Sequence, residues 1–233
     1  MATATSTSRP DKGPKTLTDQ AYQQLRDDII HGHLAPNTKL RIEPLRQQYG
    51  VGATPLREAL SRLSSDGFVT IEGQRGFKVA DMTLEDLEDV TSLRVVLENQ
   101  ALTQSITKGD DVWEAGLVAA FHRLAKLEES AERDIRDWEE RNAAFHNALT
   151  GACRSQWLKR FYAVLYDQHK RYRNLARSDT HTRDIHAEHE AIYKAALARD
   201  VEAACQANEY HIRQTALVAQ RLMEEEHAQQ AGE

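Results

Sequence analysis

The chain has 233 residues and a formal net charge of −6, with 40% hydrophobic and 28% charged residues. This length fits a small domain joined to a larger one, each able to bury its own core. Its two cysteines, Cys153 and Cys205, provide no disulfide framework, and no apolar run approaches the length of a membrane span. Residues 1–15 lack the hydrophobic stretch of a signal peptide and predict a disordered tail. We therefore expect a cytoplasmic protein with no membrane partner.

The charge is divided unevenly along the chain. Residues 1–80 carry a net charge of +3, whereas residues 81–233 carry −9. A mildly basic module followed by an acidic one is typical of a nucleic-acid-binding domain joined to a second domain. We place the basic domain at residues 16–80, the acidic domain at 81–226 and a flexible C-terminal tail at 227–233.

Three helices are predicted in the basic domain. Apolar residues recur at helical spacing over residues 20–31, and a shorter helix is expected over residues 42–49. The segment Gly50-Val-Gly52 then gives a tight turn before a third helix, with Thr54 as the expected N-cap and Pro55 as the first helical residue. The order helix, helix, turn, helix is typical of a DNA-binding module.

A short hairpin follows the third helix. Residues 68–71 and 77–79 are short runs of β-forming residues, and the two glycines between them permit a hairpin turn. Three helices followed by such a hairpin predict a winged helix-turn-helix. The wing tip carries Arg75 between glycines, where it could reach a minor groove or the DNA backbone.

From Thr83 onward the sequence predicts only helices. Thr83–Asp86 resembles a capping box, and Gly109–Asp110 is expected to end the first helix. Five more helices are expected at about 111–130, 134–150, 155–176, 182–198 and 200–226. The predicted fold class is therefore mainly α, with a winged helix-turn-helix domain followed by an all-α six-helix bundle. Such bundles hold ligand and metal sites between facing helices.

Three histidines fall on three different helices of this bundle. His146 lies four residues after Asn142, so the two share a helix face, and His189 and His211 lie on the last two helices. Three imidazoles and an oxygen donor match a divalent metal site, although solvated or core histidines fit the same spacing. The other seven histidines are expected at surface or loop positions: His31, His33, His122, His169, His181, His186 and His227.

Several segments resemble a known family. Residues 40–79, with Gly-Ala-Thr-Pro-Leu-Arg-Glu-Ala-Leu-Ser-Arg-Leu over 52–63, resemble the winged-helix domain of the GntR superfamily of transcription regulators. The helical remainder resembles the ligand-binding domain of the FadR branch of that superfamily, called FCD, with matches at residues 93–98, 145–146, 188–189 and His211. The resemblance covers nearly everything after residue 18 and implies a transcriptional regulator.

The resemblance implies a metal centre. In the FCD pattern His146, His189 and His211 hold a divalent metal, with zinc as the first choice and nickel or manganese as alternatives, and the metal helps to bind the carboxylate of a small organic acid. Asn142 stands where the family usually has aspartate, so the fourth ligand would be a neutral amide oxygen. The lost charge weakens the attraction for the metal and leaves a bound metal more positive toward an anion. In the alternative, the site is partly decayed and Asn142 hydrogen-bonds to His146.

Buried arginines are candidates for holding the acid. Arg94 lies among apolar residues of the first bundle helix and is expected to turn inward, where it needs an anion. The resemblance implies that it binds the effector carboxylate, and the alternative is a salt bridge to Glu98 one turn on. Arg171 and Arg173 are further candidates for this role, although most such clusters are solvated.

Arg57, near the start of the third helix, is the residue expected to contact the DNA bases. Arginine can bond to the O6 and N7 atoms of guanine together, whereas the alternative here is an ion pair with Glu43 or Glu58. Thr54 is expected to contact a phosphate or a base. The residues expected at the DNA backbone or in the wing are Arg41, Arg46, Arg62, Arg75 and Gly76.

These features predict a homodimeric transcription factor that binds double-stranded operator DNA. A module of net charge +3 neutralises few phosphates, which favours a dimer that binds two half-sites. The family's usual mode implies a repressor of a catabolic operon released by a small carboxylate. A loose likeness of residues 51–57 to regulators of glutarate and aminobutyrate catabolism indicates a short dicarboxylate. Two alternatives are a metal-dependent hydrolase with Glu188 or Glu190 as base, and a DNA-binding protein whose bundle only dimerises.

Overall fold

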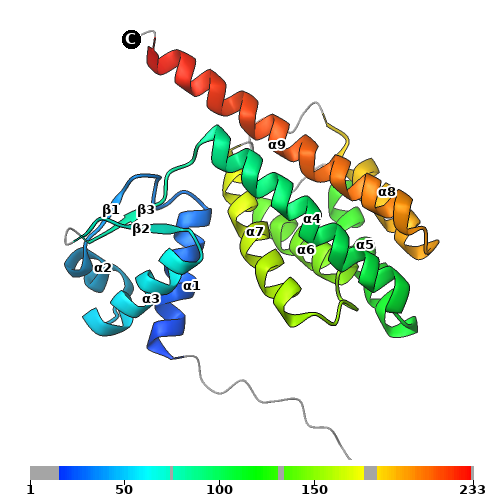
Figure 1. The fold of residues 1–233 in the computed structure, drawn as a ribbon, viewed down its shortest axis with the longest axis horizontal. Helices are drawn as coiled ribbons and strands as arrows, with labels where there is room; N and C mark the ends of the chain where they lie inside the picture. Colours follow the sequence, from blue (N-terminus) through cyan, green and yellow to red (C-terminus); the bar gives the residue numbers. More distant parts are fainter. Residues whose placement is uncertain (1–15, 74–75, 131–133, 176–182, 232–233) are drawn as a thin grey trace, which may run out of the picture. The chain divides into compact units, whose positions relative to one another are not determined.

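The computed structural model describes residues 16–73, 76–130, 134–175 and 183–231. The chain divides into two compact units, one ending at Asp81 and the other beginning at Met82 (Figure 1). The tail expected at residues 1–15 lies outside the described residues, as do Arg75, His181 and the side chain of His227.

The first unit consists of three helices and a small antiparallel sheet. The helices are α1 (Leu17–Ile30), α2 (Ile42–Tyr49) and α3 (Ala53–Ser65), and the strands are β1 (Lys39–Leu40), β2 (Val69–Ile71) and β3 (Phe77–Val79) (Figure 1). The strand order is β1-β3-β2, with both outer strands antiparallel to β3. The predicted winged helix-turn-helix is confirmed. Strand β1 was not expected, because two residues are too few for an alternating pattern.

Apolar residues at helical spacing form the core of this unit. Leu25 of α1 and Leu56, Leu60 and Leu63 of α3 are fully buried, and Phe68 lies against them at the start of the hairpin. Side chains three and four positions apart share a helix face, so α1 and α3 each bury one apolar stripe and leave the opposite face in water.

The start of α3 corrects one prediction. The helix begins at Ala53, and Gly52 is its N-cap with an extended backbone, so Thr54 is not the cap. Pro55 is the third helical residue, where its missing N–H is tolerated because the first four N–H groups of a helix have no partner within it. The side chain of Thr54 is therefore not used for capping, and Thr54 is exposed on the first turn.

The second unit contains six helices in the described residues. They are α4 (Leu84–Lys108), α5 (Asp111–Glu128), α6 (Ile135–Leu149), α7 (Gln156–Leu175), α8 (Ile185–Leu197) and α9 (Val201–Ala231). Helix α4 packs against α7 and α9, while α5 packs against α6 and α8 against α9 (Figure 1). The predicted all-helical architecture is confirmed, and α9 continues five residues beyond the expected end at 226. None of the described helices combines the length and apolar character that a membrane span requires.

Side-chain caps begin several of these helices. The hydroxyl oxygen of Thr83 accepts a hydrogen bond from the backbone N–H of Asp86 at 3.1 Å, which starts α4. Aspartates do the same for α5, α6 and α8 from positions 110, 134 and 184. Each cap satisfies one N–H group that the helix itself leaves unpaired.

Candidate metal centre

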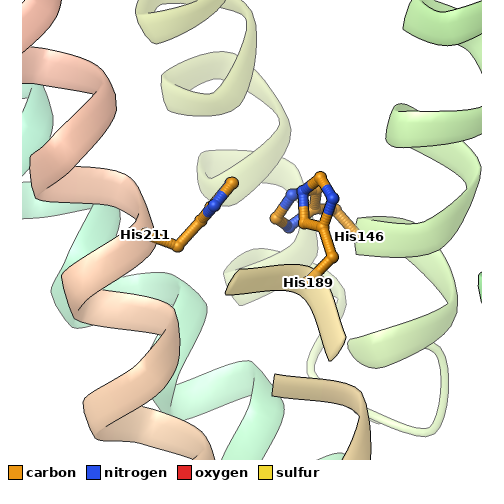
Figure 2. A group of neighbouring side chains, drawn as sticks. All are labelled: His146, His189 and His211. Atoms are coloured by element: carbon orange, nitrogen blue, oxygen red, sulfur yellow. The ribbon is translucent and has the colours of Figure 1, made fainter. Parts of the chain in front are cut away.

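Three histidines from three helices meet inside the second unit. His146 of α6, His189 of α8 and His211 of α9 are buried, and each offers a ring nitrogen within 4.8 Å of the others. Their rings point toward one another, with the centroids of His189 and His211 4.6 Å apart (Figure 2). The structure thus brings together the three histidines that the sequence singled out.

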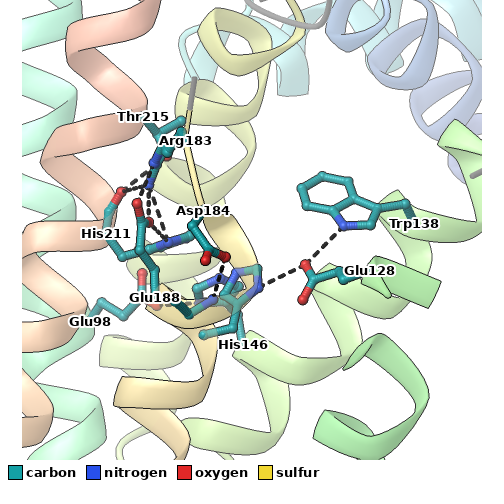
Figure 3. Close-up of polar contacts among 11 residues, drawn as sticks. Glu98, Glu128, Trp138, His146, Arg183, Asp184, Glu188, His211 and Thr215 are labelled. Atoms are coloured by element: carbon teal, nitrogen blue, oxygen red, sulfur yellow. Dashed lines mark hydrogen bonds and ion pairs between the residues drawn. The ribbon is translucent and has the colours of Figure 1, made fainter. Parts of the chain in front are cut away.

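A carboxylate holds the Nδ1 atom of each histidine. Glu98 lies 2.9 Å from His146, and Glu188 lies 2.8 Å from His211 (Figure 3). Glu128 lies 2.9 Å from His189. A carboxylate accepts hydrogen bonds, so each Nδ1 carries the proton and each Nε2 presents a lone pair. Metal-binding histidines in proteins are commonly oriented in this way.

The histidine cluster favours neutral rings. Burial lowers the pKa of His146 to about 4, although Glu98 acts in the opposite direction. Burial, followed by the neighbouring His189 and His146, places the pKa of His211 well below its usual value. Two imidazoles are therefore uncharged near neutral pH, which is the state that binds metals.

Asn142, one helical turn before His146, carries an unpaired side-chain oxygen. Its Nδ2 donates to the hydroxyl of Tyr166 at 3.1 Å, while its buried Oδ1 has no hydrogen-bond partner in the described residues. The Nε2 atoms of His146 and His189 are also buried and unpartnered there. Buried acceptors are rarely left unpaired, and these lie among residues whose types are those of a divalent metal site. The residues present therefore fit such an ion, and the expected hydrogen bond from Asn142 to His146 is not found.

The three carboxylates are themselves tied to other groups. Glu98 uses one oxygen for His146 and the other for Arg94, and these partners more than offset the burial that would raise the pKa of Glu98. Arg183 donates through Nε to Glu188 at 2.6 Å and also to the backbone oxygen of His211 (Figure 3).

The third carboxylate, Glu128, is held by different groups. It accepts from the indole N–H of Trp138 at 3.0 Å (Figure 3). His186 lies 3.3 Å from its other oxygen. Every carboxylate in contact with the three histidines is thus held by at least one group besides its histidine.

Arg94 forms the salt bridge that was one of the two roles considered for it. Its Nε donates to Glu98 at 2.9 Å, so the predicted salt bridge exists, and its side chain is only 3% exposed. Its remaining NH2 group is buried without a partner in the described residues. Arg173 forms an ion pair with Glu139 at 2.6 Å, and its side chain is largely buried. The sequence did not decide whether this side chain was buried or solvated. Arg171 is buried beside Gln168.

His169 was wrongly expected at the surface. It is completely buried, and its Nδ1 lies 2.9 Å from the NH1 group of Arg94. The polar run Gln168-His-Lys-Arg171 gave it the pattern of a solvated face, but the interior of this bundle is itself polar. His186 is also only partly exposed, because it contacts Glu128. His33 and His122 are exposed as expected, and His31 lies in the turn after α1.

The residues expected to contact DNA lie on the first unit and differ in whether they form ion pairs there. Arg57 is exposed on the first turns of α3 and makes no ion pair within the described residues. Arg46 pairs with Glu43 at 3.0 Å, and Arg62 pairs with Asp19 at 2.8 Å. Arg41 is exposed, and Gly76 adopts a φ of 105° at the wing, a conformation that glycine adopts readily.

Comparison with known proteins accounts for both units. The family model described as "Bacterial regulatory proteins, gntR family" matches residues 17–79, and the FCD domain model matches residues 89–214. The chain belongs to the GntR family of transcriptional regulators and carries an FCD domain. Its expected family and fold are thereby confirmed, and it is a DNA-binding transcriptional regulator of this type.

Named relatives agree with this assignment. The chain is 40% identical to BphR of Paraburkholderia xenovorans (strain LB400), an uncharacterized HTH-type transcriptional regulator, over 89% of this chain and 87% of BphR. It is 34% identical to the HTH-type transcriptional repressor GlaR of Escherichia coli (strain K12), over 87% of this chain and 95% of GlaR. The solved structure of E. coli McbR/YncC has a similar fold, with a TM-score of 0.75 at 20% identity over 88% of this chain and 98% of that one.

Proposed function

We propose that this regulator is a homodimeric repressor of a catabolic operon, released from its operator when a small carboxylate binds beside a divalent metal in the FCD domain. The observation that carries the proposal is the set of three histidines, each with Nδ1 held by a carboxylate, together with the unpaired Oδ1 of Asn142. His146, His189, His211 and Asn142 would hold the metal, which is zinc, nickel or manganese by ligand type. When bound, the metal supplies a positive centre that attracts a carboxylate.

The donor set explains why an anion is needed. Three neutral imidazoles and an amide leave the charge of a divalent ion uncompensated by its direct ligands. Arg94 adds a buried guanidinium whose NH2 group has no acceptor in the described residues. An anion that enters here satisfies both groups, so metal and carboxylate each strengthen the binding of the other.

The DNA-binding roles follow from exposure and pairing. Arg57 is assigned to base edges because it is exposed and makes no ion pair in the described residues. Thr54, exposed on the same first turn, is assigned to a phosphate or a base. The residues assigned to the DNA backbone or the wing are Arg41, Arg46, Arg62, Arg75 and Gly76. A net charge of +3 on residues 1–80 makes two modules on one operator the stronger arrangement.

A mobility-shift experiment tests this proposal. The full chain, purified without a metal-affinity tag, is titrated onto its own upstream DNA with and without a chelator and a series of small organic acids. We expect a shifted band that an acid weakens only when metal is present. The His146→Gln variant should keep the shift and lose the response to the acid, whereas the control His122→Gln, at an exposed histidine of α5, should keep both. Failure of the wild-type chain to shift the DNA at low salt, together with metal-dependent hydrolysis of an ester or amide, would support the hydrolase alternative.

A regulator whose bundle only dimerises predicts a different result. A true effector raises the melting temperature as its concentration passes the dissociation constant. Thermal-shift screening of organic acids against the metal-loaded chain therefore distinguishes the two cases, because a bundle without an effector site responds to none of them.

A further inference from the structure

The interior of the FCD domain holds a second set of unpaired polar atoms, on different helices from the first. The NH2 group of Arg94 on α4 and the Nε2 atom of His169 on α7 are buried and have no hydrogen-bond partner in the described residues. Both side chains are at most 3% exposed. Unpaired buried polar groups are costly, so two of them on side chains that contact each other indicate a missing partner.

The contact with Arg94 fixes the proton of His169. The NH1 group of Arg94 is only a donor, so the Nδ1 atom of His169, 2.9 Å away, must accept. The ring proton therefore lies on Nε2, and the unpaired atom is an N–H donor. Burial and the neighbouring Arg94 lower the pKa of His169 well below its usual value, which keeps the ring neutral with this single proton.

The two sets of unpaired atoms are of opposite kinds. Asn142 Oδ1 and the Nε2 atoms of His146 and His189 are acceptors, which suit a cation. Arg94 NH2 and His169 Nε2 are donors, which suit an anion. Glu98 accepts from His146 through one oxygen and from the Nε of Arg94 through the other, and it makes no hydrogen bond to either unpaired donor.

Tyr166 lies between the two sets. Its hydroxyl accepts from Asn142, its ring lies 5.7 Å from that of His146, and the guanidinium of Arg94 lies 4.7 Å from the centre of its ring. His169 follows Tyr166 by three residues on α7, so both side chains lie on one face of the helix. The donors are therefore one aromatic side chain away from the proposed metal ligands.

The charges near the site indicate which anion fits. Four cationic side chains here, Arg94, Lys170, Arg173 and Arg183, form ion pairs with three carboxylates, Glu98, Glu139 and Glu188. A fourth carboxylate, Glu128, accepts a hydrogen bond from the indole N–H of Trp138. The charges of these eight side chains cancel, so a divalent metal with neutral ligands adds two positive charges to them. A dianion removes this excess, whereas a monoanion removes half of it.

Resting on the proposed function, we propose that Arg94 NH2 and His169 Nε2–H bind a second carboxylate of the effector, whose first carboxylate lies at the metal. His169 is then the residue that distinguishes a dicarboxylate from a monocarboxylate. Loss of a hydrogen bond to a charged group at a buried site corresponds to a fall in affinity of about 10- to 100-fold.

His169→Asn is the variant that tests this role. The Oδ1 atom of asparagine can replace Nδ1 as the acceptor for Arg94, but asparagine has no donor at the position of Nε2. The metal-loaded full chain is titrated calorimetrically with succinate, glutarate and adipate, and with butyrate, valerate and hexanoate as monocarboxylates of equal length. We expect the variant to bind the best dicarboxylate about 10- to 100-fold more weakly and the matched monocarboxylate unchanged, with wild-type metal content.

Two controls separate the possible failures. The His122→Asn variant, at an exposed histidine, should bind both classes like the wild type, and unchanged monocarboxylate binding by His169→Asn shows that the metal centre is folded. Equal loss of both classes, or no loss of either, would overturn the second-carboxylate assignment while leaving the metal centre in place. Wild-type protein that loads metal but binds neither class would instead overturn the carboxylate part of the proposed function, and the inference with it.

Discussion

Replacement of Glu98 by glutamine tests how the helical domain holds its interior charges. Glu98 is completely buried, and it contacts Arg94 at 2.9 Å through one oxygen and His146 at 2.9 Å through the other. Removing one partner of a buried ion pair costs about 3–5 kcal/mol, because the remaining charge is left unpaired. Glutamine keeps one acceptor oxygen, so we expect Glu98→Gln to lower the free energy of unfolding by about 3 kcal/mol, the lower end of this range.

The chain offers a matched control on α9. Glu209 and Arg213 form an ion pair at 2.7 Å with the same four-residue spacing, but their side chains are 42% and 50% exposed. Solvent-exposed helix pairs contribute about 0.3–0.5 kcal/mol, so Glu209→Gln should have little effect. Both variants remove a glutamate charge from a Glu–Arg pair four residues apart, and one pair is buried whereas the other is exposed.

The assay is urea unfolding followed by tryptophan fluorescence in the presence of a chelator. All three tryptophans, Trp113, Trp138 and Trp157, lie in the second unit, so the signal reports that unit alone. With a slope of about 2 kcal/mol per M, a loss of about 3 kcal/mol lowers the unfolding midpoint by about 1.5 M. A midpoint shift for Glu98→Gln no larger than that for Glu209→Gln would refute the reasoning.

Three further predictions concern other contacts. Asn142→Asp should bind more metal per chain by elemental analysis, because an anionic ligand attracts a cation more strongly; equal and negligible metal in both proteins would contradict the metal centre. Burial alone would raise the pKa of Glu139, but Arg173 and Lys170 more than offset it and hold the pKa below its usual range. The unfolded chain therefore binds a proton at Glu139 more tightly than the folded chain does, so the free energy of unfolding falls as the pH drops below about 4.3. Glu139→Gln should flatten this part of a plot of stability against pH. An unchanged slope would contradict the ion pairs of Glu139 with Arg173 and Lys170. Thr83→Ala removes the cap of α4 and should cost about 1 kcal/mol in the same urea assay, whereas no change would mean that the cap is not used.

The sequence predicted the helices well because their signals are local. Apolar spacing and capping residues such as Thr83 depend only on neighbours in the chain, and the structure has the expected cap there. The same locality explains the errors. Whether Gly52 or Thr54 begins α3 depends on how the preceding turn is closed, and strand β1 exists only because it pairs with β3.

The three histidines could be found from the sequence, but their partners could not. Glu98, Glu128 and Glu188 lie on three different helices, and no spacing rule connects each of them to its histidine. The position of His169 could not be predicted either, because a histidine in a polar run has the same sequence pattern whether it is solvated or faces a polar interior. Only the packing of α7 against α4 places it beside Arg94.

The position of α4 in the chain has a mechanical consequence. The helix begins at Leu84, directly after the boundary between the two units, and Arg94 lies ten residues further along it, or about 15 Å at 1.5 Å per residue. The hydroxyl of Tyr172 on α7 contacts Asp86 at 2.5 Å and so ties the first turn of α4 to the helix that carries His169. Backbone hydrogen bonds resist stretching of a helix along its axis, so a displacement of Arg94 along the axis of α4 is expected to move Thr83 by a similar amount. The same helix therefore carries the buried guanidinium and begins where the chain leaves the DNA-binding unit.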